Sequence, residues 1–140
     1  MFTQDRNRLR LFYCEVWERY RNNLPLQPLE QQIGEVISMH PEYHELLEDR
    51  EAALGMEANP ELGESNPFLH LALHVSIREQ IGSDQPSGIR KIHGRLLVKL
   101  GDAHRAEHRM MECLAAELWQ AQQDGSTLDG AAYMRRLERV

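Results

Sequence analysis

Histidines are the residues whose number and spacing most clearly indicate chemistry in this chain. There are seven in 140 residues, and six of them form pairs four residues apart: His40/His44, His70/His74 and His104/His108. Random placement of seven histidines would give about 0.3 such pairs. Residues four apart lie one above the other on a helix, so a pair can direct both imidazoles to one ion. The spacing therefore predicts a metal site built on helices.

Two of the pairs fall where burial is expected. His70 and His74 lie in the most apolar helical stretch, and His104 and His108 share a stripe with apolar residues of their helix. Burying several imidazoles costs free energy unless each nitrogen is hydrogen-bonded or metal-bound. The sequence therefore predicts His70, His74, His104 and His108 as metal ligands. Beside that stripe, Glu112 is the expected carboxylate ligand, and Glu107 the expected base or hydrogen-bond partner.

The other three histidines carry weaker signals. His93 stands alone on an apolar face, where a single histidine is typical of a hydrogen-bonded core residue. His40 and His44 stand on either side of Pro41. Because proline disfavours helical geometry at the residue before it, these two are not expected to share one regular helix. Their roles stay open.

Several kinds of metal chemistry fit these residues. Neutral imidazoles with carboxylates and no thiolate suit zinc, iron or manganese as a divalent ion. The stretch His104-Arg-Ala-Glu107-His108 fits the H-x-x-E-H signature of inverted zinc proteases, which suggests a metal-dependent hydrolase, although the chain is short for a peptide cleft. The order of the histidine groups also resembles a hemerythrin-like redox bundle, whereas the E-x-x-H signature of ferritin-like di-iron proteins is absent. The alternative is a non-catalytic interaction protein whose core histidines form a structural network that fixes helix register.

The elements that position these histidines are predicted to be helices throughout. Apolar residues recur at helical spacing and no useful strand alternation is found, which predicts an all-α, single-domain, bundle-like array of about six helices over residues 1–140. Asn66-Pro67 is a helix start, Gly101 a helix end, and Thr127 the cap of the last helix. Residues 51–66 are expected to form an acidic loop. In the long helix over 103–123, the residues expected to face inward are Met111, Leu114, Ala115, Leu118 and Trp119.

Charge and hydropathy exclude some classes of protein. The net charge of −6 argues against a general nucleic-acid binder. No apolar run is long enough for a membrane span, and the N-terminus lacks the pattern of a secretory signal, so a cytoplasmic location is expected. Residues 42–64 hold eight acidic residues and one arginine, a net −7. This segment is either a solvated face or a docking surface for a basic protein partner.

Three stretches carry a resemblance to a known family: NPFLHLALHVSIREQ (66–80), DQPSGIR (84–90) and HRAEHRMMECLAAELWQAQ (104–122). With the YMRRLER tail and the helical start, the chain resembles over nearly its whole length a proteobacterial family of uncharacterised proteins, domain of unknown function 1841. The resemblance implies a small, stand-alone cytoplasmic bacterial protein. It implies no activity, substrate or ligand.

Overall fold

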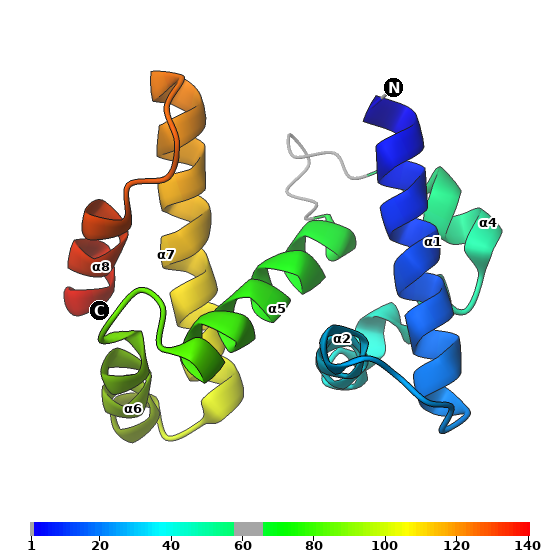
Figure 1. The fold of residues 1–140 in the computed structure, drawn as a ribbon, viewed down its shortest axis with the longest axis horizontal. Coiled ribbons are helices and arrows are strands. Elements are labelled where there is room, and N and C mark those ends of the chain that lie inside the picture. Colours follow the sequence, from blue (N-terminus) through cyan, green and yellow to red (C-terminus); the bar gives the residue numbers. More distant parts are fainter. Residues whose placement is uncertain (1, 58–65) are drawn as a thin grey trace. The chain divides into compact units, whose positions relative to one another are not determined.

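The computed structural model describes residues 2–57 and 66–140, and these residues form helices joined by turns (Figure 1). Eight α-helices and one 3-10 helix occur in the described ranges, without a strand, which confirms the all-α prediction and exceeds the six helices expected. No helix among them is long and apolar enough to cross a membrane. The elements are α1 (Phe2–Arg21), α2 (Pro28–Ser38), η1 (Pro41–Tyr43), α3 (His44–Leu47), α4 (Arg50–Gly55), α5 (Pro67–Ser83), α6 (Ile89–Leu100), α7 (Ala103–Asp124) and α8 (Gly130–Glu138).

The chain divides into two compact units, Met1–Ala72 and Leu73–Val140. The boundary falls inside α5, so this helix belongs with its first turns to the N-terminal unit and with its remainder to the C-terminal unit. A single domain over residues 1–140 stays a prediction.

In the N-terminal unit, α1 packs against α2, α3 and α4. Val16 and Trp17 of α1 are buried, as the apolar spacing of that helix predicts. Gly34 of α2 makes the close approach to α1 possible, because a Cβ at this position would overlap the ring of Tyr20. The α1–α2 contact therefore depends on the absence of a side chain at Gly34.

Arg10 of α1 is one of the buried charged residues. Only 3% of Arg10 is exposed. Its guanidinium donates to the carbonyl oxygens of Ala53 at 3.0 Å and of Met56 at 2.8 Å, at the end of α4. It also lies 4.9 Å from the centre of the Phe68 ring. Arg10 thus ties α1 to the last turn of α4 and to the first turn of α5.

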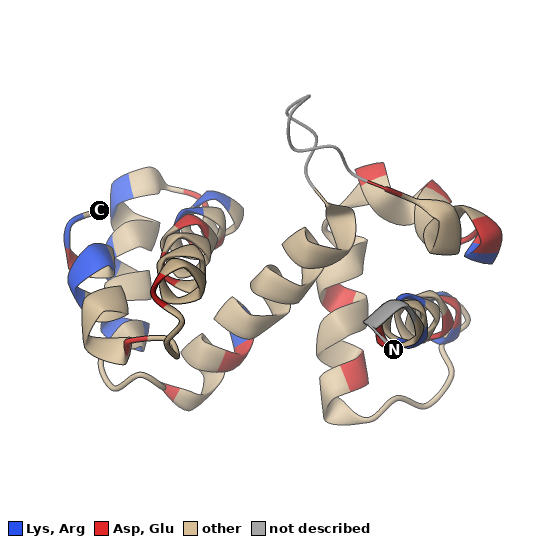
Figure 2. Cartoon of the chain, turned by 90° about the horizontal axis from the view of Figure 1, so that it is seen from above, with Lys and Arg blue, Asp and Glu red and all other residues tan. Residues whose placement is uncertain are grey.

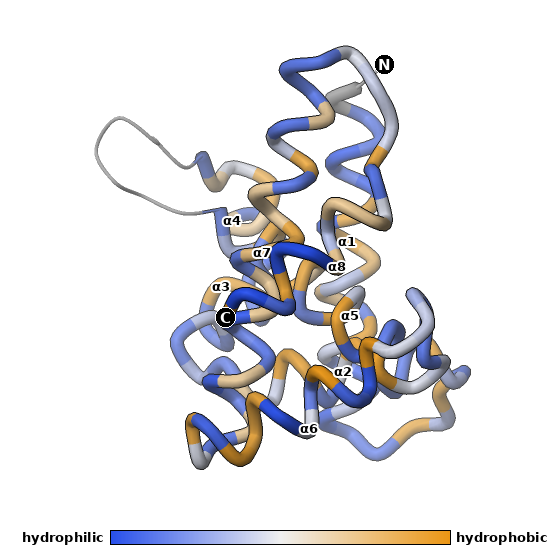
Figure 3. Tube along the Cα trace, turned by 90° about the vertical axis from the view of Figure 1, so that its left-hand side faces the viewer, coloured by the Kyte–Doolittle hydropathy of each residue, from blue (hydrophilic) through white to orange (hydrophobic). Residues whose placement is uncertain are grey.

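The C-terminal unit has one hydrophobic core to which its four helices contribute. Figure 3 shows α5 among the more hydrophobic parts of the chain, and its Ile77 is completely buried in this core. Tyr133 of α8 is buried as well, and its hydroxyl donates to Gln80 of α5 at 2.7 Å. The other buried members are Ile89, Ile92, Leu96, Ala106, Met110, Met111, Cys113, Leu114 and Leu137.

Capping residues define the helix ends near the histidines. The Asn66 side chain accepts from the backbone N–H of Phe68 at 2.9 Å, which confirms the predicted start of α5. Gly101 ends α6 in the left-handed conformation, as predicted. The predicted cap of α8 is wrong: the Asp129 carboxylate, not Thr127, accepts from the N–H groups of Ala131 and Ala132. Asp129 lies directly before the first helical turn, where a cap must be.

The long helix α7 is turned differently from the prediction. Trp119 is 60% exposed and Leu118 is 40% exposed, so neither faces the core as expected. Met111 and Leu114 are buried, as expected. The buried face also holds residues that the expected stripe omits: Ala106, Glu107, Met110, Cys113, Glu117 and Ala121. Glu117 is buried because Arg136 of α8 pairs with it at 2.8 Å.

The acidic segment 42–64 is only partly within the described residues. Helix α4 occupies the start of the expected loop over 51–66, and residues 58–65, with Glu61 and Glu64, lie outside the described ranges. Figure 2 shows the charged residues along the chain. Glu48 of this segment pairs with Arg21, and Arg50 pairs with Glu18. A docking role for the segment stays a prediction.

Replacement of Gly34 by alanine tests the α1–α2 contact. The added methyl group must displace the Tyr20 ring, so Gly34→Ala is expected to lower the free energy of unfolding by about 1–3 kcal/mol. Gly55→Ala is the matched control, because a Cβ there meets nothing within 4 Å. Urea denaturation of both variants measures the effect. Equal stability of the two variants would contradict the close approach.

Candidate metal centre

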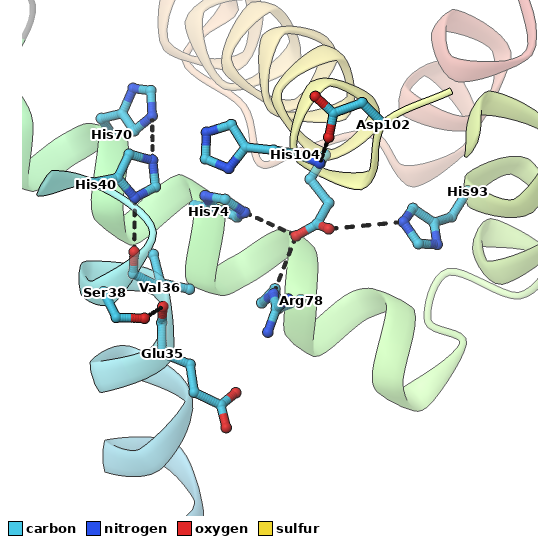
Figure 4. Close-up of polar contacts among 11 residues, drawn as sticks. Glu35, Val36, Ser38, His40, His70, His74, Arg78, His93, Asp102 and His104 are labelled. Atoms are coloured by element: carbon cyan, nitrogen blue, oxygen red, sulfur yellow. Dashed lines mark hydrogen bonds and ion pairs between the residues drawn. The ribbon is translucent and has the colours of Figure 1, made fainter. Parts of the chain in front are cut away.

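The N-terminal unit contributes a pair of histidines whose Nε2 atoms approach each other. His40 is fully buried, and its Nε2 lies 3.1 Å from Nε2 of His70 (Figure 4). The other ring nitrogen of His40, Nδ1, lies 2.7 Å from the carbonyl oxygen of Val36. Because a carbonyl only accepts, Nδ1 of His40 carries the proton, and Nε2 of the neutral ring carries the lone pair. His40 thus presents a metal-binding nitrogen toward His70.

The turn around Pro41 brings His40 to this position. Pro41 begins the 3-10 helix η1 directly after His40, so α2 ends before the proline, as expected. Tyr43 stacks on the His40 ring with the centres 5.6 Å apart and meets the His70 ring edge-on at 5.8 Å. His44, by contrast, has its Nε2 2.7 Å from the Ile37 carbonyl oxygen and packs on Trp17. His40 and His44 are four residues apart but therefore do not direct their rings to one common ion.

The C-terminal unit contributes His74, which is fully buried on α5. Its Nε2 lies 2.8 Å from Oε1 of Glu107 on α7 (Figure 4). The carboxylate accepts from Nε2–H, so the neutral His74 ring carries its lone pair on Nδ1. A metal-binding histidine commonly donates its other ring N–H to a carboxylate, and this hydrogen bond orients the imidazole.

Glu107 is a buried carboxylate held by several cations and donors. Burial raises its pKa, but hydrogen bonds from His74 and from Arg78, whose Nε is 3.1 Å away, outweigh this and lower it to about 2. His93 Nε2 lies 4.0 Å from the second carboxylate oxygen. Burial lowers the pKa of His93, against the opposite influence of Glu107. A carboxylate with a pKa near 2 is a poor proton acceptor at neutral pH. The contact with His74 fits the predicted hydrogen-bond role of Glu107, and its role as a base stays a prediction.

Two more imidazoles lie against His74 within the same unit. The ring centres of His74 and His108 are 5.2 Å apart, and those of His74 and His104 are 5.5 Å apart. His104 and His108 are 4.0 Å apart along α7. The predicted approach of the second and third histidine pairs is therefore seen for these three residues.

Among the residues that the structure describes, four histidines form a group that could hold a metal ion: His40, His70, His74 and His108. Helix α5 carries one histidine of each unit, His70 and His74, spaced by one turn. Residues four apart lie on the same face of a helix.

Two predicted ligands are not members of this group. Glu112 is exposed on α7 and forms an ion pair with Arg109. His104 lies beside the group and is not one of the four. The sequence assigns no ligand role to His40, although its spacing from His44 singles it out. The stronger signal is its place directly before Pro41, where a helix ends and the chain turns.

Comparisons with known proteins assign a family and no function. The family model described as a domain of unknown function, DUF1841, matches residues 5–139. No curated protein and no solved structure matches the chain. The resemblance drawn from the sequence motifs is confirmed for the family, whereas a bacterial origin stays a prediction.

The pKa of Glu107 leads to a prediction about acid stability. The unfolded carboxyl group titrates near 4.5 and the folded one near 2, so the unfolded chain takes up this proton first. Glu107 therefore contributes stability above about pH 4.5, of the order of 3 kcal/mol, that is lost as the pH falls through the folded pKa. Urea unfolding at several pH values should show the difference between wild type and Glu107→Gln shrinking toward acid. Glu79→Gln, at an exposed position of α5, should show a small difference. A Glu107→Gln effect that is constant from pH 6 to pH 2.5 would be the contrary result.

Proposed function

The chain belongs to the DUF1841 family, and we propose from its own side chains that it binds a transition-metal ion through His40, His70, His74 and His108. The observation that carries the proposal is the approach of two ring nitrogens, His40 Nε2 and His70 Nε2, to 3.1 Å. Two nitrogens bound to one zinc ion at 2.0–2.1 Å in a tetrahedral site stand about 3.3 Å apart. The pair therefore needs little movement to share an ion.

The support on the opposite nitrogens favours the same proposal. The Val36 carbonyl holds Nδ1–H of His40, and the Glu107 carboxylate holds Nε2–H of His74. Both are acceptors of the kind that fix the tautomer and ring orientation of metal-bound histidines. Each supporting contact lies within one unit, so each histidine is oriented by its own surroundings.

The ligand type narrows the choice of metal. Four imidazoles without a coordinating carboxylate suit zinc, iron, copper or nickel better than manganese, magnesium or calcium. Four histidines also complete the tetrahedral coordination of a structural zinc ion, which leaves no position for water. Zinc in a closed site is therefore the first ion to test. A hydrolase or a redox protein requires in addition an open position or a redox-active metal.

Metal titration of paired variants tests the proposal. The untagged protein, freed of metal with a chelator, is expected to bind about one Zn²⁺ per chain and to gain thermal stability, because binding to the folded chain alone stabilises it. His40→Gln and His74→Gln are expected to abolish this gain. His44→Gln is the matched control, since the His44 ring bonds to the Ile37 carbonyl. Calorimetry and elemental analysis measure the stoichiometry, and circular dichroism checks that each variant folds.

Two results of this titration would contradict the proposal. A wild-type protein that takes up no divalent ion and gains no stability would refute metal binding. The histidines would then form a hydrogen-bonded core network, which is the structural alternative. Binding that survives in both His40→Gln and His74→Gln would place the ion elsewhere.

Removal of the supporting carboxylate is the second test. Glu107→Ala leaves His74 without the acceptor that orients it, so the affinity for Zn²⁺ is expected to fall about 10–100-fold. Glu107→Gln keeps an acceptor oxygen, so its affinity for Zn²⁺ should fall less than that of Glu107→Ala. Glu112→Ala is the control, because Glu112 is exposed and paired with Arg109. If Glu112→Ala weakened binding more than Glu107→Ala, Glu112 would be a ligand, as the sequence alone suggests.

A further inference from the structure

His104 lies against two of the proposed ligands without being one of the four. Its ring centre is 4.0 Å from that of His108, at an interplanar angle of 51°, and 5.5 Å from that of His74, at 67°. The four-histidine group does not include it. Four histidines already complete a tetrahedral coordination sphere. We therefore ask what a fifth imidazole beside the bound ion could do other than coordinate it permanently.

The position of His104 on α7 is at the solvent end of the helix. It is the second residue of α7, and its backbone N–H donates to the Asp102 carboxylate at 3.0 Å. Residues 101–103 and 105 are exposed, and His104 itself is half-buried. His108 is half-buried as well and lies one turn further into the helix. Along α7 from its exposed first turn, His104 therefore comes before His108.

A buried site needs such a residue because a hydrated ion must exchange its water molecules for protein ligands. His74 is completely buried, so it cannot receive a fully hydrated ion. The exposed Asp102 carboxylate attracts cations to the start of α7. The positive end of the α7 dipole, in contrast, disfavours a cation that stays there. The two effects together favour brief binding at His104.

On these grounds we propose that His104 is the capturing residue of the site: it binds the incoming metal ion first and passes it to His108 and His74. The inference rests on the proposed function, because it requires an ion to be bound by the four histidines. It assigns to His104 an effect on the rates of uptake and release and only a small effect on the equilibrium affinity. Loss of a ligand of the metal-bound site would instead lower the equilibrium affinity strongly.

The rates of zinc exchange distinguish these roles. His104→Gln keeps the size of the side chain and removes the ring nitrogens. Stopped-flow transfer of Zn²⁺ from a chromogenic chelator to the metal-free protein measures uptake, and transfer back to excess chelator measures release. Both rates are expected to fall by about tenfold or more, with the dissociation constant unchanged within about threefold. His44→Gln is the control, because the His44 ring bonds to the Ile37 carbonyl and is not a member of the histidine group.

Each other outcome overturns the inference in a recognisable way. A dissociation constant that rises more than tenfold in His104→Gln would make His104 a ligand of the resting site. Unchanged rates in His104→Gln, or equal slowing of exchange in His44→Gln, would show that His104 has no specific role in metal uptake. A wild-type protein that binds no Zn²⁺ would refute the proposed function itself, and with it this inference.

Discussion

The buried carboxylate of Glu107 is the constraint on which the C-terminal half of the site depends. A carboxylate that is 5% exposed is costly unless cations and donors compensate it. His74 and Arg78 supply that compensation from one face of α5, and His93 adds a ring nitrogen from α6. Satisfying Glu107 therefore fixes how α5 meets α7. It also fixes which nitrogen of His74 carries the lone pair.

The N-terminal unit orients its own histidine pair in a comparable way. The Nε2 atoms of His40 and His70 approach each other, and the Val36 carbonyl accepts from Nδ1–H of His40. His40 and His74 are thus each oriented by an acceptor of their own unit.

Much of the fold could be predicted from the sequence, because helix period and capping are local properties. The bounds of α5 and α6 follow from Asn66-Pro67 and Gly101, and the spacing of four residues identifies His70, His74 and His108. The rotation of α7 could not be predicted in this way. Its apolar stripe contains Leu118 and Trp119, yet the buried face lies to one side of that stripe and holds Glu117, which Arg136 of α8 neutralises.

That rotation also distinguishes the two carboxylates that the sequence places beside the histidines, Glu107 and Glu112. Glu107 and Glu112 flank the histidine stripe of α7 on opposite sides, and residues on a helix differ by about 100° per position. Turning the helix toward the Glu107 side buries this residue and exposes Glu112, together with Trp119. The side that turns inward depends on partners from other helices, His74 and Arg78 of α5 and Arg136 of α8. The sequence leaves the role of His40 open for a related reason: its partner His70 is thirty positions away, and no local periodicity encodes such a contact.

The choice between a metal site and a hydrogen-bonded network depends on protons. Two neutral imidazoles at 3.1 Å share one proton, and this arrangement is complete in itself as a structural contact. It holds only while the contact carries a single proton, because a second proton makes one ring cationic and sets two N–H groups against each other in a buried site. A metal ion in place of the shared proton uses the Nε2 lone pairs of both rings, with the His70 proton on Nδ1, and each ring stays neutral. The acceptors on the far nitrogens of His40 and His74 then stabilise the positive charge that the ion brings. The same contacts thus serve as a core network without metal and as oriented ligands with it, and the two states differ in whether a proton or a metal ion lies between His40 and His70.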